Sequence, residues 1–251
     1  TRSGGVWTQQ GNKLVGTGSI NINGVTQGSS VSLSADGNTA MVGGWADNTN
    51  IGAAWIFTRT GNTWTQQGNK LVGTSGVGLS AQGISVSISA DGNTAIVGGN
   101  EDNNGDGAAW VYTRSAGLWT QQGNKLVGTG SIGKANQGLS VALSADGNTA
   151  IVGGWYDNIG EGAAWVYIRS GNTWTQQGDK LVGSGAVGTA GQGWSVSLSA
   201  DGNTAIVGGI GDNGNEGAAW VYSRSGDIWT QQGNKLVGTG NAGAAAQGKS
   251  V

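Results

Sequence analysis

The chain has 251 residues and a formal net charge of −2, and only 10% of its residues are charged. This balance argues against a nucleic-acid partner, which would require a basic stripe. The absence of Cys and His removes disulfides, thiolate metal sites and the common nucleophile–base pairs of enzymes. The 52 Gly would be typical of disorder, but the 12 Trp indicate a packed core, so we expect a turn-rich β protein.

The first predicted element is a single outer β-strand within residues 1–16, which contains Trp7. It belongs to the sequence WTQQGNKLVG, which returns at the end of every later repeat with at most one change. No companion strands precede it, so we interpret residues 1–16 as an orphan strand. We expect it to pair with the terminal sheet, where it would cover an edge that could otherwise aggregate.

The heptapeptide SADGNTA occurs four times, and the interval between successive copies is constant. An Asp-Gly pair between alternating apolar segments is a strong β-hairpin signal, because both residues tolerate positive φ. We therefore predict a tight turn between two strands in each of four repeats. The aspartates of these turns are Asp36, Asp91, Asp146 and Asp201.

The second repeat shows the four predicted strands most clearly. The first strand, which begins near residue 83, alternates Val86 and Ile88 with serines. The second strand (94–99) and the third (107–115) are apolar on both faces, as in a sheet that is covered on both sides. The fourth strand (119–128) is more polar, which is typical of an edge. No apolar period of 3.6 residues extends over a useful length, so we expect almost no helix.

Four short strands per repeat predict an all-β fold. We favour a β-propeller of four-stranded blades, with about 55 residues per blade, over a flat solenoid stack. Residues 1–251 would form a single propeller domain or a propeller fragment. Either an incomplete fifth blade, a longer propeller or partner chains would have to close the ring. The predicted blades lie at approximately 28–73, 83–128, 138–183 and 193–238, and a further inner strand begins at 247–251.

The repeated motifs QGxSVSLSADGNTAIVGG and GAAWVY resemble the FG-GAP repeats of integrin α-subunit propellers, in the bacterial variant with QG and VGG for FG and GAP. In the second repeat the resemblance is carried by Gln82-Gly83, Ser85-Val86, Val97-Gly98-Gly99 and Gly107 to Tyr112. It implies a propeller, a secreted or cell-surface setting, and an adhesive or lectin-like role. SADGNTA stands in place of the family's calcium loop and supplies only one Asp, so that metal site is not carried over.

Two groups of segments differ among the repeats, namely the loops between the second and third strands and the segments between blades. In a propeller both emerge on the same face, which predicts a recognition surface, although drift in unconstrained loops is the alternative. Aromatic residues that only some copies have could stack on sugar rings or apolar side chains, or could fill gaps between blades. The aromatic candidates for ligand binding are Trp45, Trp155, Tyr156 and Trp194.

Every loop between the second and third strands also carries Asp-Asn. The polar candidates for ligand binding are Asn100 and the four aspartates of these pairs, Asp47, Asp102, Asp157 and Asp212. We favour Asx turns, in which each carboxylate caps its own backbone, over binding of a cation or sugar hydroxyl. Asp102, Asn104 and Asp106 match the first half of a calcium loop, but no later acid follows. We expect no cofactor and no bound metal, and calcium at Asp102, Asn104 and Asp106 is the alternative.

Other recurring residues fit structural roles. The lysines of GNKLVG and the arginines that end the third strands are predicted to protect edges and to form paired surface charges. The Trp of GAAWVY and the Trp of WTQQ are predicted to lie in the core or between blades.

The sequence therefore favours a non-enzymatic, extracellular recognition or adhesion propeller that binds a glycan or a protein through the variable loops. Catalysis is disfavoured because the acidic residues repeat with the blades and no unique pair stands out. The alternative is a structural building block, engineered or recently amplified, that assembles or closes by strand exchange between chains. We expect no membrane-spanning segment, since no apolar run is long enough.

Overall fold

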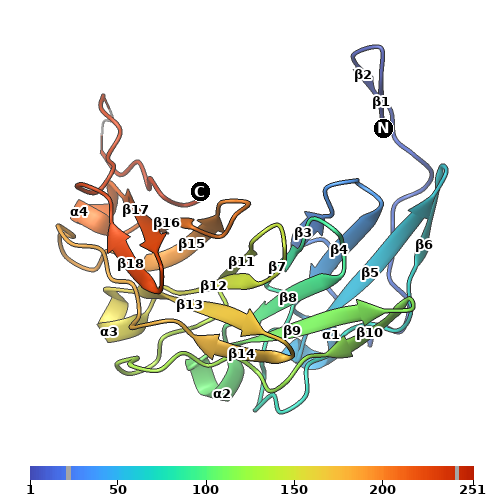
Figure 1. Cartoon of the computed structure of the whole chain (residues 1–251), viewed down its shortest axis with the longest axis horizontal. Coiled ribbons are helices and arrows are strands. Elements are labelled where there is room, and N and C mark those ends of the chain that lie inside the picture. Colours follow the sequence, from blue (N-terminus) through green and yellow to red (C-terminus); the bar gives the residue numbers. More distant parts are fainter. Residues whose placement is uncertain (21–23, 241–242) are drawn as a thin grey trace.

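The computed structural model describes residues 1–20, 24–240 and 243–251. Within these residues the chain forms a two-stranded hairpin and four antiparallel sheets of four strands each, which follow one another in an arc (Figure 1). The prediction of an all-β chain built from four-stranded repeats is confirmed. No helix in the described part is long and apolar enough to cross a membrane.

Within each sheet the strands follow chain order, and every neighbouring pair is antiparallel. The hairpin consists of β1 (Arg2–Ser3) and β2 (Val6–Trp7). The first sheet consists of β3 (Ser30–Leu33), β4 (Thr39–Gly44), β5 (Ala53–Thr60) and β6 (Thr63–Gln66). The second consists of β7 (Ser85–Ile88), β8 (Thr94–Gly99), β9 (Ala108–Ser115) and β10 (Leu118–Gln121). The third consists of β11 (Ser140–Leu143), β12 (Thr149–Gly154), β13 (Ala163–Ser170) and β14 (Thr173–Gln176). The fourth consists of β15 (Gln192–Leu198), β16 (Thr204–Gly209), β17 (Ala218–Ser225) and β18 (Ile228–Gln231).

A single helical turn separates the second and third strands of each sheet. These turns are α1 (Asp47–Asn50), α2 (Asp102–Gly105), α3 (Asp157–Gly160) and α4 (Asp212–Asn215). Each contains three residues with positive φ, for example Asn103 (50°), Asn104 (59°) and Gly105 (98°). The turns are therefore tight loops rather than regular helices, and Asn is the residue that tolerates this conformation best after Gly.

The N-terminal segment differs from the prediction of one outer strand that pairs with the terminal sheet. Arg2 pairs with Trp7 across a turn at Gly4 and Gly5, where both φ values are positive. This pairing corresponds to that of Arg224 with Trp229 between the third and fourth strands of the last sheet. This hairpin stands clear of the sheets (Figure 1). The residues that follow contact the first sheet instead, since the indole Nε1 of Trp55 donates to the carbonyl of Thr17 at 2.9 Å.

The C-terminal residues 247–251 form no strand, in contrast to the inner strand that the sequence predicts. Gln247 makes an isolated parallel bridge to Gly217, and the last residues pair with no neighbouring strand of the described structure. The physical reason is that a strand needs a partner for its backbone groups, and no described segment lies alongside these residues as one.

The apolar core lies between successive sheets. In β8, Ile96 packs against the third sheet while the adjacent Val97 packs against the first, and both are fully buried. This confirms that the middle strands are covered on both faces. The Trp residues of GAAWVY are also fully buried and lie in these clusters, as predicted. They are Trp55, Trp110, Trp165 and Trp220.

The Trp residues of WTQQ are half-buried in the four sheets and pack at the margins of the same clusters, whereas Trp7 on the hairpin is exposed. The arginines that end the third strands lie over these rings. The guanidinium carbon of Arg114 is 5.5 Å from the centre of the Trp119 ring, and its Nε donates to Asn93 at 2.9 Å. These arginines therefore act through cation–π and amide contacts rather than as the predicted surface ion pairs.

The SADGNTA turn is held by its own side chains. The Ser34 hydroxyl and the backbone N–H of Asn38 both donate to the carboxylate of Asp36, at 2.6 and 2.9 Å. These hydrogen bonds, with a third from the Asn38 amide, lower the pKa of Asp36 to about 2. The side chains of the turn thus replace backbone partners that a tight turn cannot supply.

The same turn also joins one sheet to the next. The backbone N–H of Ala35 donates to the carbonyl of Ala90, Ala90 donates to Ala145, and Ala145 donates to Ala200, each at 2.9 Å. A row of hydrogen bonds thus links the equivalent turns of all four sheets. Each turn must fit at least one equivalent turn, and the two middle turns must fit two, which favours the same sequence in every repeat.

One buried polar group in each of the last three sheets has no hydrogen-bond partner within the described structure. It is the hydroxyl of Tyr112, Tyr167 or Tyr222, and burial raises the pKa of each. The first sheet has Phe57 at the same position, equally buried. We expect Tyr112→Phe to leave the free energy of unfolding unchanged or to raise it by up to about 1 kcal/mol, because an unpaired hydroxyl is no longer desolvated.

Urea unfolding measures this effect, and Phe57→Tyr is the reverse control. That variant should lose a matching amount, up to about 1 kcal/mol, since it introduces a hydroxyl where the equivalent sites offer no partner. A loss of more than about 1 kcal/mol in Tyr112→Phe would show that the hydroxyl is hydrogen-bonded in solution.

Candidate functional site

The loops that join the second and third strands lie against the segments that connect the sheets. The backbone N–H of Ala81, in the segment between the first two sheets, donates to the carbonyl of Asn50 in α1 at 2.9 Å. A parallel bridge joins Gly52 to Gln82, and equivalent bridges recur at the other boundaries. The prediction that both groups of variable segments share one face is confirmed. We call it the loop face.

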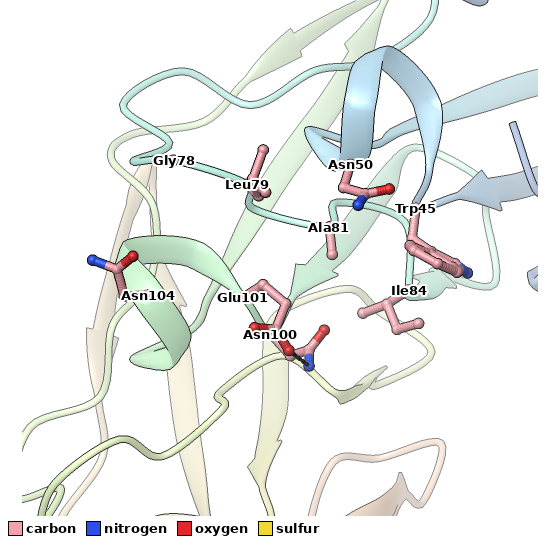
Figure 2. A pocket seen from close by; sticks show the side chains of 9 residues that line it. All are labelled: Trp45, Asn50, Gly78, Leu79, Ala81, Ile84, Asn100, Glu101 and Asn104. Carbon is pink, nitrogen blue, oxygen red and sulfur yellow. Dashed lines mark hydrogen bonds between the residues drawn. The ribbon is translucent and has the colours of Figure 1, made fainter. Parts of the chain in front are cut away.

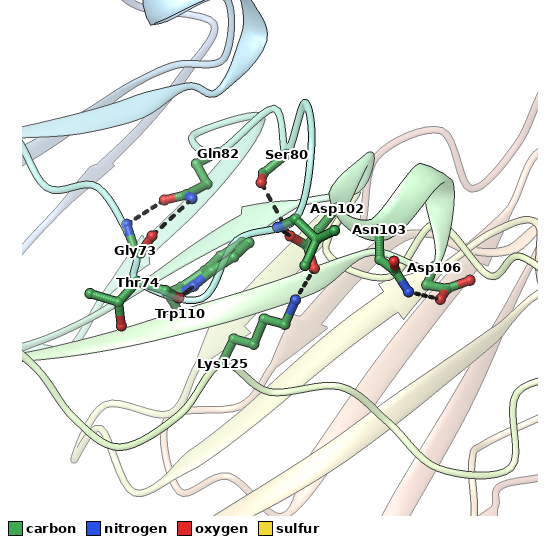
Figure 3. A network of polar contacts seen from close by, with 10 residues as sticks. Gly73, Thr74, Ser80, Gln82, Asp102, Asn103, Asp106, Trp110 and Lys125 are labelled. Atoms are coloured by element: carbon green, nitrogen blue, oxygen red, sulfur yellow. Dashed lines mark hydrogen bonds and ion pairs between the residues drawn. The ribbon is translucent and has the colours of Figure 1, made fainter.

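Buried aspartates hold the loop face together (Figure 3). Asp102 at the start of α2 is 1% exposed, and its Oδ1 accepts hydrogen bonds from the Val77 backbone N–H at 2.7 Å and the Ser80 hydroxyl at 3.1 Å. Its Oδ2 forms an ion pair with Lys125. Each carboxylate thus ties a loop to the preceding segment and to the end of its own sheet. The four pairs are Asp47–Lys70, Asp102–Lys125, Asp157–Lys180 and Asp212–Lys235.

This arrangement differs from the predicted Asx turns. Each aspartate accepts a hydrogen bond from an N–H group in another segment, not from one in its own loop. The arrangement also leaves no oxygen of Asp47, Asp102, Asp157 or Asp212 facing solvent, since all four residues are 0–1% exposed. These aspartates therefore have a structural role, and we leave them out of the candidate contact surface. The lysines of the four sheets do form ion pairs, but their partners are buried aspartates.

The candidate calcium ligands of the second repeat are engaged with other groups. Asp102 is paired with Lys125, and Oδ2 of Asp106 accepts a hydrogen bond from the Asn103 amide at 2.5 Å. Asn104 lines a groove instead. Within the described residues, no three His, Cys, Asp or Glu side chains gather as they would around a metal ion.

The first groove lies on the loop face between the first two sheets and has a volume of about 530 Å³ (Figure 2). Its walls come from the loop of the first sheet, the connecting segment and the loop of the second sheet. An indole, three amides and a carboxylate accompany aliphatic side chains. The lining residues are Trp45, Asn50, Gly78, Leu79, Ala81, Ile84, Asn100, Glu101 and Asn104.

A second groove of about 240 Å³ lies between the third and fourth sheets. Its lining residues are Trp155, Tyr156, Ile159, Gly160, Thr189, Gly191, Ile210, Gly211 and Asn215. The Trp155 ring is 5.0 Å from that of Tyr156 and 5.4 Å from that of Trp194, which it meets edge-on. Tyr156 and Ile159 remain 41% and 76% exposed. The structure thus brings three of the predicted aromatic residues into one cluster.

The two grooves are equivalent, because their indoles, Trp45 and Trp155, each directly follow a VGG motif and occupy the same position in the first and third repeats. The boundary between the second and third sheets has no such indole. There Asn100 replaces the Trp, and its carbonyl accepts a hydrogen bond from the Asn136 amide at 3.1 Å. Lys134 and Asn136 also lie beside Gly105. Boundaries with and without an indole therefore alternate along the arc.

Sequence reasoning selected Trp45, Asn100, Trp155, Tyr156 and Trp194, and the structure places all five on the loop face at the two grooves. It missed the aliphatic side chains that line the grooves with them. The missed lining residues include Leu79, Ile84, Ile159 and Ile210. A comparison of alternate repeats would have pointed to these two boundaries, since GNTWTQQG and the Trp after VGG occur only in the first and third repeats.

No family model matches the chain, and no curated protein matches it. Among solved structures, the chain is similar to a functionally unknown protein from Desulfotomaculum acetoxidans, with 14% identity and a TM-score of 0.53 over 81% of this chain and 54% of that one. It is also similar to TolB from Acinetobacter baumannii, with 15% identity and a TM-score of 0.46 over 83% of this chain and 43% of TolB. The chain thus spans about half the length of these proteins, and the likeness concerns the fold alone.

Proposed function

We propose that the four sheets are blades of a β-propeller and that the chain is a non-enzymatic recognition module, secreted or at the cell surface, that binds glycans. The observation that carries this proposal is the pair of equivalent grooves on the loop face, each with an indole and at least one amide side chain. The resemblance of the repeats to FG-GAP sequences supports the same role.

The chemistry of the first groove favours a neutral sugar over a protein segment. The face of an indole matches the C–H face of a pyranose ring, and amides can donate and accept hydrogen bonds as sugar hydroxyls require. Trp45 shares the groove with Asn50 and Asn100, and Glu101 adds an acceptor. A small number of polar groups around an apolar floor is typical of ligand grooves.

The test is binding of the purified chain to a glycan array, compared with Trp45→Ala, Trp155→Ala and the double variant. At each groove, loss of the indole should cost about 2 kcal/mol, or roughly 30-fold in Kd. Trp7→Ala is the matched control, because Trp7 is 76% exposed on the N-terminal hairpin and lines neither groove. If no glycan binds, or if the double variant binds as well as the parent, the proposal is wrong.

A further inference from the structure

Successive sheets meet through the same two surfaces at each of the three internal boundaries. In the second sheet, Val86 and Ile88 of the first strand pack against the face of the preceding sheet, which presents Met41, Ile56 and Leu71. All five residues are 0–8% exposed. The equivalent residues meet in the same way between the second and third sheets and between the third and fourth.

Each end of the arc leaves one half of this interface uncovered. On the first sheet Val31 and Leu33 are 68% and 60% exposed, whereas their equivalents in the second sheet are 8% and 7% exposed. On the last sheet Leu236 is 53% exposed, whereas Leu181 is 7% exposed. We call these surfaces the head face (first sheet) and the tail face (last sheet). They are complementary, because each carries the residues that the other covers inside the arc.

From this complementarity we infer that the chain self-associates, and that the head face of one copy packs against the tail face of a second copy. The contact continues an interface that the structure already contains three times, so it needs no new chemistry. It is heterologous, and such contacts give either closed rings or open fibres. Two copies contribute eight sheets, which lies within the range of roughly four to eight at which radial sheets close, so we expect a closed dimer.

The N-terminal segment occupies part of the head face in the way that a preceding sheet would. Residues 6–17 and 228–239 are identical except for Val6 and Ile228. Thr17 accepts a hydrogen bond from the Trp55 indole at 2.9 Å, as Ser184 does from Trp220. When a second copy docks, its residues 228–239 can take over these contacts. The N-terminal segment is therefore replaced by its own equivalent. On the tail face, Gln247 and Gly248, which contact Gly217 and Ser195, give way in the same manner to Gln27 and Gly28 of the second copy.

The experiment compares the molar mass in solution, by light scattering after size exclusion, of the chain and of two variants. Leu33→Glu places a charge on the head face, and Leu236→Glu places one on the tail face. We expect the parent chain to have twice the monomer mass at micromolar concentration and each variant to be monomeric. An equimolar mixture of the two variants should form a one-to-one dimer, since the intact tail of one can bind the intact head of the other.

Leu118→Glu is the control, because Leu118 is 67% exposed on an outer strand of the second sheet and belongs to neither face. It should behave as the parent does. Circular dichroism checks that each variant is folded, which we expect because the substituted side chains are solvent-exposed in the single chain. A parent chain that stays monomeric overturns the inference, and so does a single variant that still dimerises, since this would indicate a symmetric head-to-head or tail-to-tail contact.

Discussion

Replacement of Asp102 by alanine is expected to lower the free energy of unfolding by about 3–5 kcal/mol, because it leaves a largely buried ammonium without its partner. The Lys125 side chain is only 17% exposed, and the Val77 N–H and Ser80 hydroxyl would also lose their acceptor. Urea unfolding followed by tryptophan fluorescence measures the loss. Lys125→Met in the same background should recover part of it, since the uncompensated charge is then removed.

Asp106→Ala is the matched control for this prediction. Asp106 lies four residues further along the same loop, is only partly buried, and accepts a side-chain hydrogen bond from Asn103. Its removal should change the free energy of unfolding by less than about 1 kcal/mol. Equal losses for the two variants would mean that the Asp102–Lys125 pair does not hold the loop face.

Gly98→Ala is expected to destabilise the chain by about 3 kcal/mol, the upper range for overpacking, because the obstacle is backbone rather than a movable side chain. A Cβ at Gly98 would lie 2.1 Å from the carbonyl oxygen of Gly138, which lies just before the first strand of the third sheet. The Gly138 carbonyl also accepts a hydrogen bond from the Ser85 hydroxyl at 2.8 Å, which restricts its movement away from Gly98. In a domain of this size the melting temperature should fall by roughly 6–12 °C, which calorimetry measures.

Gly208→Ala provides the same substitution with a different neighbour. A Cβ at Gly208 would also lie 2.1 Å from a carbonyl oxygen, in this case the oxygen of Gly248. Gly248 lies in the C-terminal segment, and no further sheet of the described structure covers that segment. The Gly248 carbonyl also accepts a hydrogen bond from the Ser195 hydroxyl at 2.7 Å, but no following sheet of the described structure fixes its segment. We therefore expect a smaller loss, of about 1–2 kcal/mol. If Gly208→Ala were as damaging as Gly98→Ala, the close approach between sheets would not be the cause.

The strands, the hairpin turns and the repeat could be predicted because their signals are local. Each of these signals depends on a few consecutive residues. They are the alternation of apolar and polar residues around Val86, the Asp-Gly pair of each turn, and the strands that are apolar on both faces. The QG and VGG motifs, which carry the resemblance to FG-GAP repeats, also have a common physical basis. The backbone N–H of Gly83 in the QG motif donates to the carbonyl of Gly98 in the VGG motif at 2.9 Å, so the two motifs are needed together.

The roles of the loop-face aspartates could not be predicted in the same way. Asp102 accepts a hydrogen bond from a backbone group 25 residues earlier and pairs with a lysine 23 residues later. Only the packing of the sheets brings these groups together. The N-terminal hairpin escaped prediction for a simpler reason, since Arg2 and Ser3 are too few residues to show an alternating pattern, although RSGGVW matches RSGDIW at Arg224.

The alternation of boundaries with and without an indole has a consequence for how such a chain can change in length. Insertion or loss of a single repeat within the array would keep every interface between sheets but would place two indole-bearing boundaries, or two without an indole, next to each other. Gain or loss of two consecutive repeats would preserve both the scaffold and the spacing of the indole-bearing grooves. The unit that repeats both the scaffold and the indole-bearing boundary is therefore a pair of sheets, whereas the unit that repeats the scaffold alone is one sheet.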